Sequence, residues 1–123
     1  MFKLDSTRAL EVTLAASITS NQLQGCVAYI DMPQKDTANR QSQLGANATF
    51  TTSSITDVTA VPAPLVVGTI REWDGFNLYN ADSVTANPTV KINTSGTDTI
   101  LVKQTLAPGE TLFCTQQNGW GII

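Results

Sequence analysis

Short stretches in which apolar and polar residues alternate dominate this chain, and they predict β-strands with one buried face. In the C-terminal third, Val90 and Ile92 alternate with Lys91 and Asn93. A Ser-Gly turn follows, and the apolar residues 100–102 run back from it. This pattern predicts a pair of antiparallel strands joined by a tight turn.

Turn residues divide the same third into further strands. Pro108-Gly109 fits the centre of a type II turn, because Pro presets φ and Gly accepts the positive φ that follows. Asn118-Gly119 is a strong signal for a two-residue hairpin loop. We therefore expect residues 76–123 to form an antiparallel meander, with Phe76, Leu78 and Asn80 on one face and Asn77 and Tyr79 on the other.

The rest of the chain predicts more strands of the same kind. The expected runs are a first strand of about eight residues from Leu10 to Ile18, residues 26–32, a weak edge strand at 49–52, and a buried strand at 65–70 that breaks at 71–75. The first run also has the spacing of a helix, but its β-branched residues favour a strand. Pro33 should end the second run, and Pro62-Ala63-Pro64 should form a stiff segment that crosses between two sheets.

These runs predict one all-β domain over residues 1–123, an antiparallel β-sandwich or jelly-roll-like barrel of about eight strands. The length of 123 residues leaves room for one core. Residues 1–8 have no clear period and predict an N-terminal arm. Residues 34–43 contain almost no apolar side chain, so we expect an exposed polar loop there.

The composition is unusual in its low charge. Only 14% of residues are charged, whereas about 25% is typical, and Thr, Ser, Asn and Gln take their place. Uncharged polar surface is easily dehydrated, so a partner could cover it, although Thr is also simply a good strand former. The net charge of −3 without a basic stripe argues against nucleic-acid binding. No apolar run approaches the roughly 20 residues of a membrane span, and residues 1–5 lack the pattern of a signal peptide.

Residues suited to catalysis or metal binding are sparse. The chain has no histidine, and its two cysteines, Cys26 and Cys114, lie in separate apolar runs where we expect free thiols. Neither has a base near it in sequence, and the carboxylates are scattered through turns. No nucleotide-binding, hydrolase or calcium-loop motif occurs. We therefore expect no enzyme, no catalytic residue, no cofactor and no metal.

Aromatic residues leave one binding function open. Trp73 and Trp120 could form a glycan-binding face if both were exposed and close together. Core packing is the commoner use of aromatic side chains in a small β domain, and it remains the alternative.

Several segments resemble one group of known proteins. They are Leu78–Val84, Thr89–Ile92, Ile100–Lys103, Leu106–Leu112, Gly119-Trp120 and the opening Leu10–Leu23. In these segments the chain resembles small virion structural proteins of tailed bacteriophages. The resemblance implies a β-rich, non-enzymatic and often oligomeric protein that is made in the host cytoplasm and incorporated into the virion.

Among such proteins, the resemblance points first to a capsid decoration (cement) protein. It would be a homotrimer on the capsid surface that binds the major capsid protein lattice and stabilises the head. A tail, fibre or baseplate component and a carbohydrate-binding adsorption module are the alternatives. The residues expected to touch neighbouring subunits are Phe2, Lys3, Leu4 and Arg8 in the arm, and Lys35, Asp36 and Arg40 in the polar loop.

Overall fold

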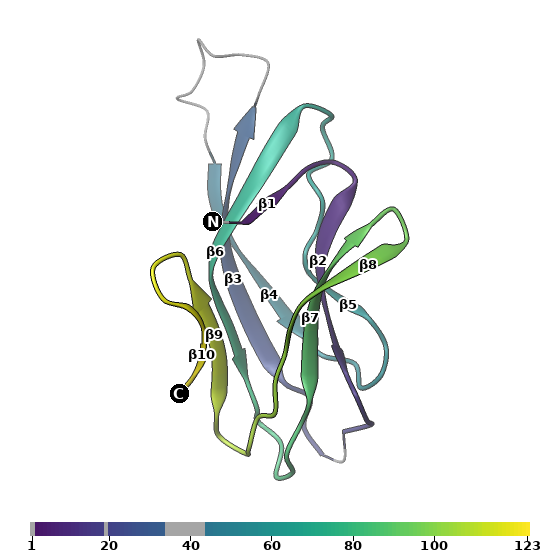
Figure 1. Cartoon of the computed structure of the whole chain (residues 1–123), viewed down its shortest axis with the longest axis vertical. Helices are drawn as coiled ribbons and strands as arrows, with labels where there is room; N and C mark the ends of the chain where they lie inside the picture. Colours follow the sequence, from purple (N-terminus) through teal and green to yellow (C-terminus); the bar gives the residue numbers. More distant parts are fainter. Residues whose placement is uncertain (1, 19, 34–43) are drawn as a thin grey trace.

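The computed structural model describes residues 2–18, 20–33 and 44–123, which form a two-layer β-sandwich (Figure 1). The described residues contain ten strands and no helix. The strands are β1 (Phe2–Leu4), β2 (Arg8–Leu14), β3 (Gln24–Pro33), β4 (Leu44–Thr51), β5 (Val58–Val61), β6 (Thr69–Tyr79), β7 (Pro88–Thr94), β8 (Thr97–Lys103), β9 (Thr111–Thr115) and β10 (Gly119–Ile122). The predicted all-β sandwich is confirmed, as two open sheets and not as a closed barrel.

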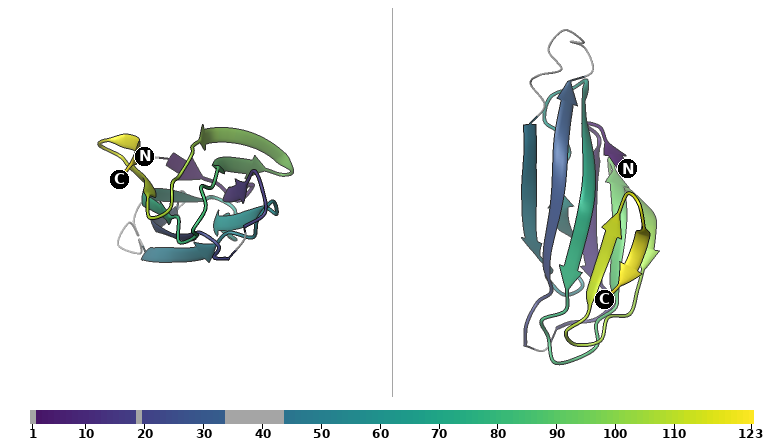
Figure 2. Two further views of the ribbon diagram at one scale, coloured as in Figure 1. Left: turned by 90° about the horizontal axis from the view of Figure 1, so that it is seen from below. Right: turned by 90° about the vertical axis from the view of Figure 1, so that its left-hand side faces the viewer.

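The layers are two antiparallel sheets, which face each other in the end-on view of Figure 2. Sheet A has the order β10-β9-β6-β3-β4, and sheet B has the order β5-β2-β7-β8. Strand β6 is the centre of sheet A. One of its edges pairs with β3, while β1 and β9 pair with opposite ends of its other edge.

Alternation along the strands of sheet B builds one wall of the core. Leu10 and Val12 on β2 are fully buried, and Val12 lies opposite the fully buried Val90 on β7. The faces predicted for both strands are therefore confirmed, although β2 ends at Leu14 and not at Ile18. The polar partners point outward, and Lys91 is nevertheless largely covered there.

A β-bulge in β6 brings two large aromatic side chains to the same face. Trp73 and Phe76 are both fully buried, and their ring centroids are 6.3 Å apart. Because they are three residues apart, strict alternation would place them on opposite faces. Between Asp74 and Asn77, β6 has one residue more than the facing stretch of β3, and Gly75 has φ 66°. The extra residue restores the inward direction of Phe76.

Two strand predictions around this region are wrong. Residues 71–75 do not break a strand, since β6 continues through them by means of the bulge. Residues 65–70 are not a buried strand, because β6 begins only at Thr69 and Leu65 is 98% exposed. An apolar run indicates burial only if a neighbouring strand is available to cover it, and none of the described strands pairs with Leu65.

The predictions of a meander and an arm also need correction. The hairpins β7–β8 and β9–β10 exist, but they lie in different sheets, so the chain crosses the sandwich between β8 and β9. Residues 2–4 are not a free arm, because β1 pairs with β6 and Leu4 is fully buried. The exposed loop predicted at 34–43 lies outside the described residues.

Local turn signals were more reliable. Gly109 has the positive φ (82°) expected after Pro108, and Gly119 closes the β9–β10 hairpin with φ 65°. That hairpin has a three-residue loop and not the predicted two, since Thr115 pairs with Gly119. Residues 62–64 do cross between the sheets, because β5 belongs to sheet B and β6 to sheet A.

Strand β8 forms an irregular edge of sheet B. Val90 pairs with Val102 and Lys91 with Ile100, which leaves Leu101 as an additional residue. The edge is therefore bulged at its most apolar point, where Ile100 is 54% exposed. Bulges on edge strands disturb the row of backbone donors and acceptors that another strand would need.

The bulge in β6 can be tested by replacing Gly75. Gly75→Ala should lower the free energy of unfolding by about 1 kcal/mol, because a side chain at φ 66° is strained even though a Cβ there would meet no atom within 4 Å. Gly75→Asn should cost less, since Asn tolerates this conformation. Urea unfolding measures both. An alanine variant as stable as the parent would show that the bulge does not require Gly75.

Candidate functional site

The connection between β5 and β6 displays an unusual apolar tip. We call residues 62–68 the apex loop; it lies at the upper end of the sandwich in Figure 1. Its side chains Leu65, Val66 and Val67 are 98%, 68% and 75% exposed. Single exposed apolar residues are common on protein surfaces, but a contiguous exposed group indicates a site of interaction.

Arg71 holds the base of the apex loop in place. Its Nη1 donates to the Pro62 carbonyl at 2.7 Å, while Nε and Nη2 donate to the two carboxylate oxygens of Asp31 at 2.6 and 2.9 Å. The guanidinium also lies 4.3 Å from the centroid of the Tyr29 ring. Only 11% of the Arg71 side chain is exposed, so these contacts are protected from solvent screening. The hydrogen bond to Asp31 raises the pKa of Arg71 further.

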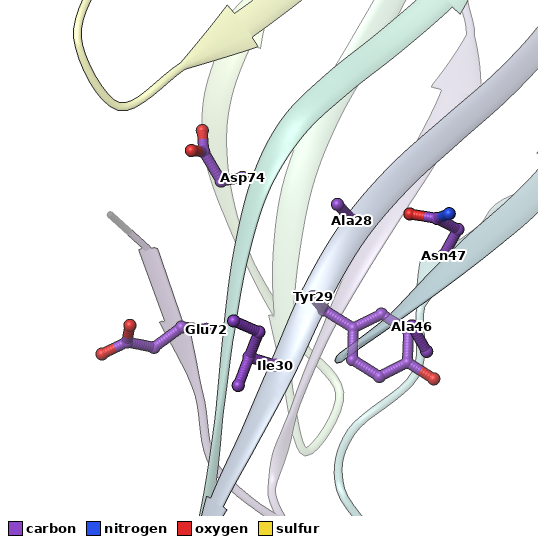
Figure 3. A pocket seen from close by; sticks show the side chains of 7 residues that line it. All are labelled: Ala28, Tyr29, Ile30, Ala46, Asn47, Glu72 and Asp74. Carbon is purple, nitrogen blue, oxygen red and sulfur yellow. The ribbon is translucent and has the colours of Figure 1, made fainter. Parts of the chain in front are cut away.

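A hollow of about 450 Å³ lies on sheet A where β3, β4 and β6 run side by side (Figure 3). We call it the β3 trough; it is lined by Ala28, Tyr29, Ile30, Ala46, Asn47, Glu72 and Asp74. The hollow exists because β3 and β4 carry small residues, Ala28 and Ala46, between larger neighbours. The two carboxylates come from β6 on one side, and the Asn47 amide comes from β4 on the other.

The two carboxylates of the β3 trough are held in different ways. Asp74 Oδ1 accepts hydrogen bonds from the backbone N–H groups of Gly75 and Gln116, both at 2.8 Å. The bulge and the β9–β10 turn thus fix its orientation. Glu72 Oε1 lies 3.6 Å from Lys3 Nζ, and the Glu72 side chain is only 19% exposed.

A second charged group lies on the outer face of sheet B. Lys91 Nζ contacts Asp57 at 2.9 Å and Asp98 at 2.8 Å, and 9% of its side chain is exposed. Glu11 is the cross-strand neighbour of Lys91, and its Oε1 is buried without a hydrogen-bond partner among the described residues. The pKa of Glu11 is raised, mainly because the carboxylate is desolvated and to a smaller extent because the negative charge of Asp57 is nearby. We call these four residues the Lys91 cluster.

The residues expected to touch neighbours are not brought together as a single surface. Lys3 and Arg8 are exposed, but each is paired within the chain, Lys3 with Glu72 and Arg8 with Asp5 at 3.9 Å. Leu4 is in the core, so the prediction that it contacts a partner is wrong for the folded chain. The backbone of Phe2 pairs with that of Trp73. The remaining three, Lys35, Asp36 and Arg40, lie outside the described residues.

The predicted glycan face is also not formed. The rings of Trp73 and Trp120 are close, with centroids 6.3 Å apart, but Trp73 is 1% exposed. Trp120 packs its ring 5.3 Å from Phe76 and belongs to the margin of the core. The two tryptophans therefore pack with Phe76 at one side of the core, because the β6 bulge turns both Trp73 and Phe76 inward.

Signs of nucleophilic or metal chemistry are few. Cys26 and Cys114 are free thiols, and burial raises the pKa of Cys114, which favours the unreactive thiol form. Within residues 2–18, 20–33 and 44–123, no three histidine, cysteine or acidic side chains are grouped as metal ligands would be. The same residues form no helix that could span a bilayer.

The chain matches no protein-family model, no curated protein and no solved structure. The resemblance to bacteriophage virion proteins therefore stays a prediction.

Sequence reasoning missed the apex loop, the β3 trough and the Lys91 cluster. The only local signal for the apex loop was the pair of prolines at 62 and 64, which lie in its first half. For the β3 trough and the Lys91 cluster, the sequence shows only that Glu72 and Lys91 lie next to apolar residues. Which strands pair with theirs depends on distant parts of the chain and cannot be predicted from the local sequence.

The Lys91 cluster predicts how stability depends on pH. Because the pKa of Glu11 is raised on folding, its ionised form destabilises the fold, and this penalty disappears as the pH falls through the folded pKa. Glu11→Gln should therefore raise the stability near neutral pH, with a gain that shrinks toward acid pH. Urea unfolding at a series of pH values measures the difference.

Asp57→Asn is the matched control for that experiment. It removes a carboxylate that neutralises Lys91, so it should lower the stability near neutral pH, by about 0.5–1 kcal/mol because the Asp57 side chain is 47% exposed. If Glu11→Gln destabilises the chain to the same extent as Asp57→Asn, Glu11 is a favourable partner of Lys91 and the account above is incorrect.

Proposed function

We propose that this chain is a virion structural protein that attaches to an assembled protein lattice through its apex loop, most simply as a capsid decoration protein. The observation that carries the proposal is the exposure of Leu65, Val66 and Val67 side by side on a loop whose first residue, Pro62, is held by Arg71. Holding the start of the loop in place reduces the conformational entropy that is lost when a partner covers these side chains. The partner is the major capsid protein, and the tip of the apex loop enters an apolar pocket between its subunits.

The composition supports the same proposal. A surface rich in Thr, Ser, Asn and Gln is less costly to dehydrate than one rich in Lys and Glu, so the area around the tip can be covered as well. A protein that binds only the intact lattice stabilises it by mass action. In a homotrimer, three tips would engage together and raise the avidity above that of one tip.

The attachment can be tested with purified protein and expanded coat shells. Replacing Leu65, Val66 and Val67 by Ser should weaken binding in a co-sedimentation assay by at least about a hundredfold, since burial of three such side chains contributes more than the roughly 3 kcal/mol to which a hundredfold change corresponds. The matched control replaces Ile55 and Val84, which are also exposed (65% and 51%), by Ser. The control should bind as the parent does.

Three outcomes would contradict the proposal in separate ways. Unchanged binding of the triple variant would exclude the apex loop as the attachment site. No binding of the parent to shells, with binding to purified tails, would assign the chain to the tail. Virions that lack the protein should release their DNA at a lower temperature, and equal thermal survival would argue against a cementing role.

A further inference from the structure

We propose that the β3 trough is a binding site for an arginine or lysine side chain presented by another protein. The site is separate from the apex loop, and it does not depend on the function proposed above. Its carboxylates, Glu72 and Asp74, come from alternate positions of one strand and line the same side of the hollow (Figure 3).

The shape of the trough suits a long side chain with an apolar stem. The floor is formed by the small Ala28 and the larger Ile30, which point to the same face of sheet A, and Ile30 is 43% exposed. Lysine and arginine bury their methylene groups along such surfaces and leave the charged end for polar partners. The volume of about 450 Å³ exceeds what one such side chain occupies, so its neighbours in an extended peptide can enter as well.

The charge of the trough favours a cation over a neutral ligand. Two backbone N–H groups hold Asp74 Oδ1, which fixes the carboxylate without neutralising its charge. Glu72 Oε1 is paired with Lys3 Nζ at 3.6 Å, and the Lys3 side chain is 64% exposed. Such an exposed, loosely placed ammonium contributes little energy, so an incoming cation can displace it.

The orientation of Asp74 argues for a built site. Gly75 lies in the bulge of β6 and Gln116 in the β9–β10 turn, yet both donate to the same carboxylate oxygen. A carboxylate held in advance binds a guanidinium with less loss of side-chain entropy than a mobile one.

The test uses the full chain, labelled with ¹⁵N, and the peptide acetyl-Val-Arg-Val-amide. The peptide should shift the amide signals of Ala28, Ile30 and Asp74 in a saturable manner, and more weakly at high salt. The same peptide with citrulline in place of arginine has nearly the same shape without the charge, and it should bind roughly fivefold more weakly. Glu72→Gln should weaken binding of the arginine peptide by a similar factor.

One lysine variant and one arginine variant separate the local effect of a charge beside Glu72 from the effect of the net charge of the chain. Lys3→Gln and Arg8→Gln each remove one positive charge, but only Lys3 lies beside Glu72. Lys3→Gln should strengthen binding about twofold or more, whereas Arg8→Gln should leave it nearly unchanged. Substitution of the apex loop should have no effect.

The proposal is overturned if the arginine and citrulline peptides bind equally, or if the shifts arise away from the trough. It is also overturned if Glu72→Gln binds as the parent does. Saturable binding of a neutral disaccharide at the same residues, without binding of the peptide, would make the trough a glycan site instead.

Discussion

The pairing of β3 with β6 across the bulge is the constraint on which the rest of sheet A depends. The extra residue in β6 lets Trp73 and Phe76 enter the core together, and the Gly75 N–H of the bulge donates to Asp74 Oδ1. One irregularity of the backbone therefore brings the two aromatic rings together and orients one carboxylate of the β3 trough. The same strand carries Arg71 near its start, so it also fixes the apex loop. Three features of the molecule have a common origin in eleven residues.

Local chemistry explains which features the sequence could predict. The turns at Pro108-Gly109 and at Ser95-Gly96 depend on the φ preferences of their own residues, and each has the positive φ that its glycine suggested. The alternation of β2 and β7 depends only on the period of a strand. Such features do not require knowledge of the partner strand, and for this reason they could be predicted from one sequence.

The features that failed all depend on distant parts of the chain. Leu65, Val66 and Val67 have the composition of a buried strand, and only the choice of Thr69 as the first paired residue leaves them exposed. The break expected at residues 71–75 is instead a bulge at Gly75, and it is the pairing with β3 that decides between a break and a bulge. Trp73 is buried because two sheets close over it. The candidate site was therefore almost entirely beyond the reach of sequence reasoning, since its residues meet only through strand pairing.

The irregular edge of β8 affects whether copies of this chain at high concentration can pair with one another edge to edge. Ile100, Leu101 and Val102 would otherwise offer a flat apolar ribbon to any neighbouring molecule, as the strands of amyloid fibres do. Because Leu101 is an additional residue, the backbone groups along this edge are out of step with those of a regular strand. The chain thus displays an apolar tip at one end, while its β8 edge offers another strand an interrupted row of backbone donors and acceptors.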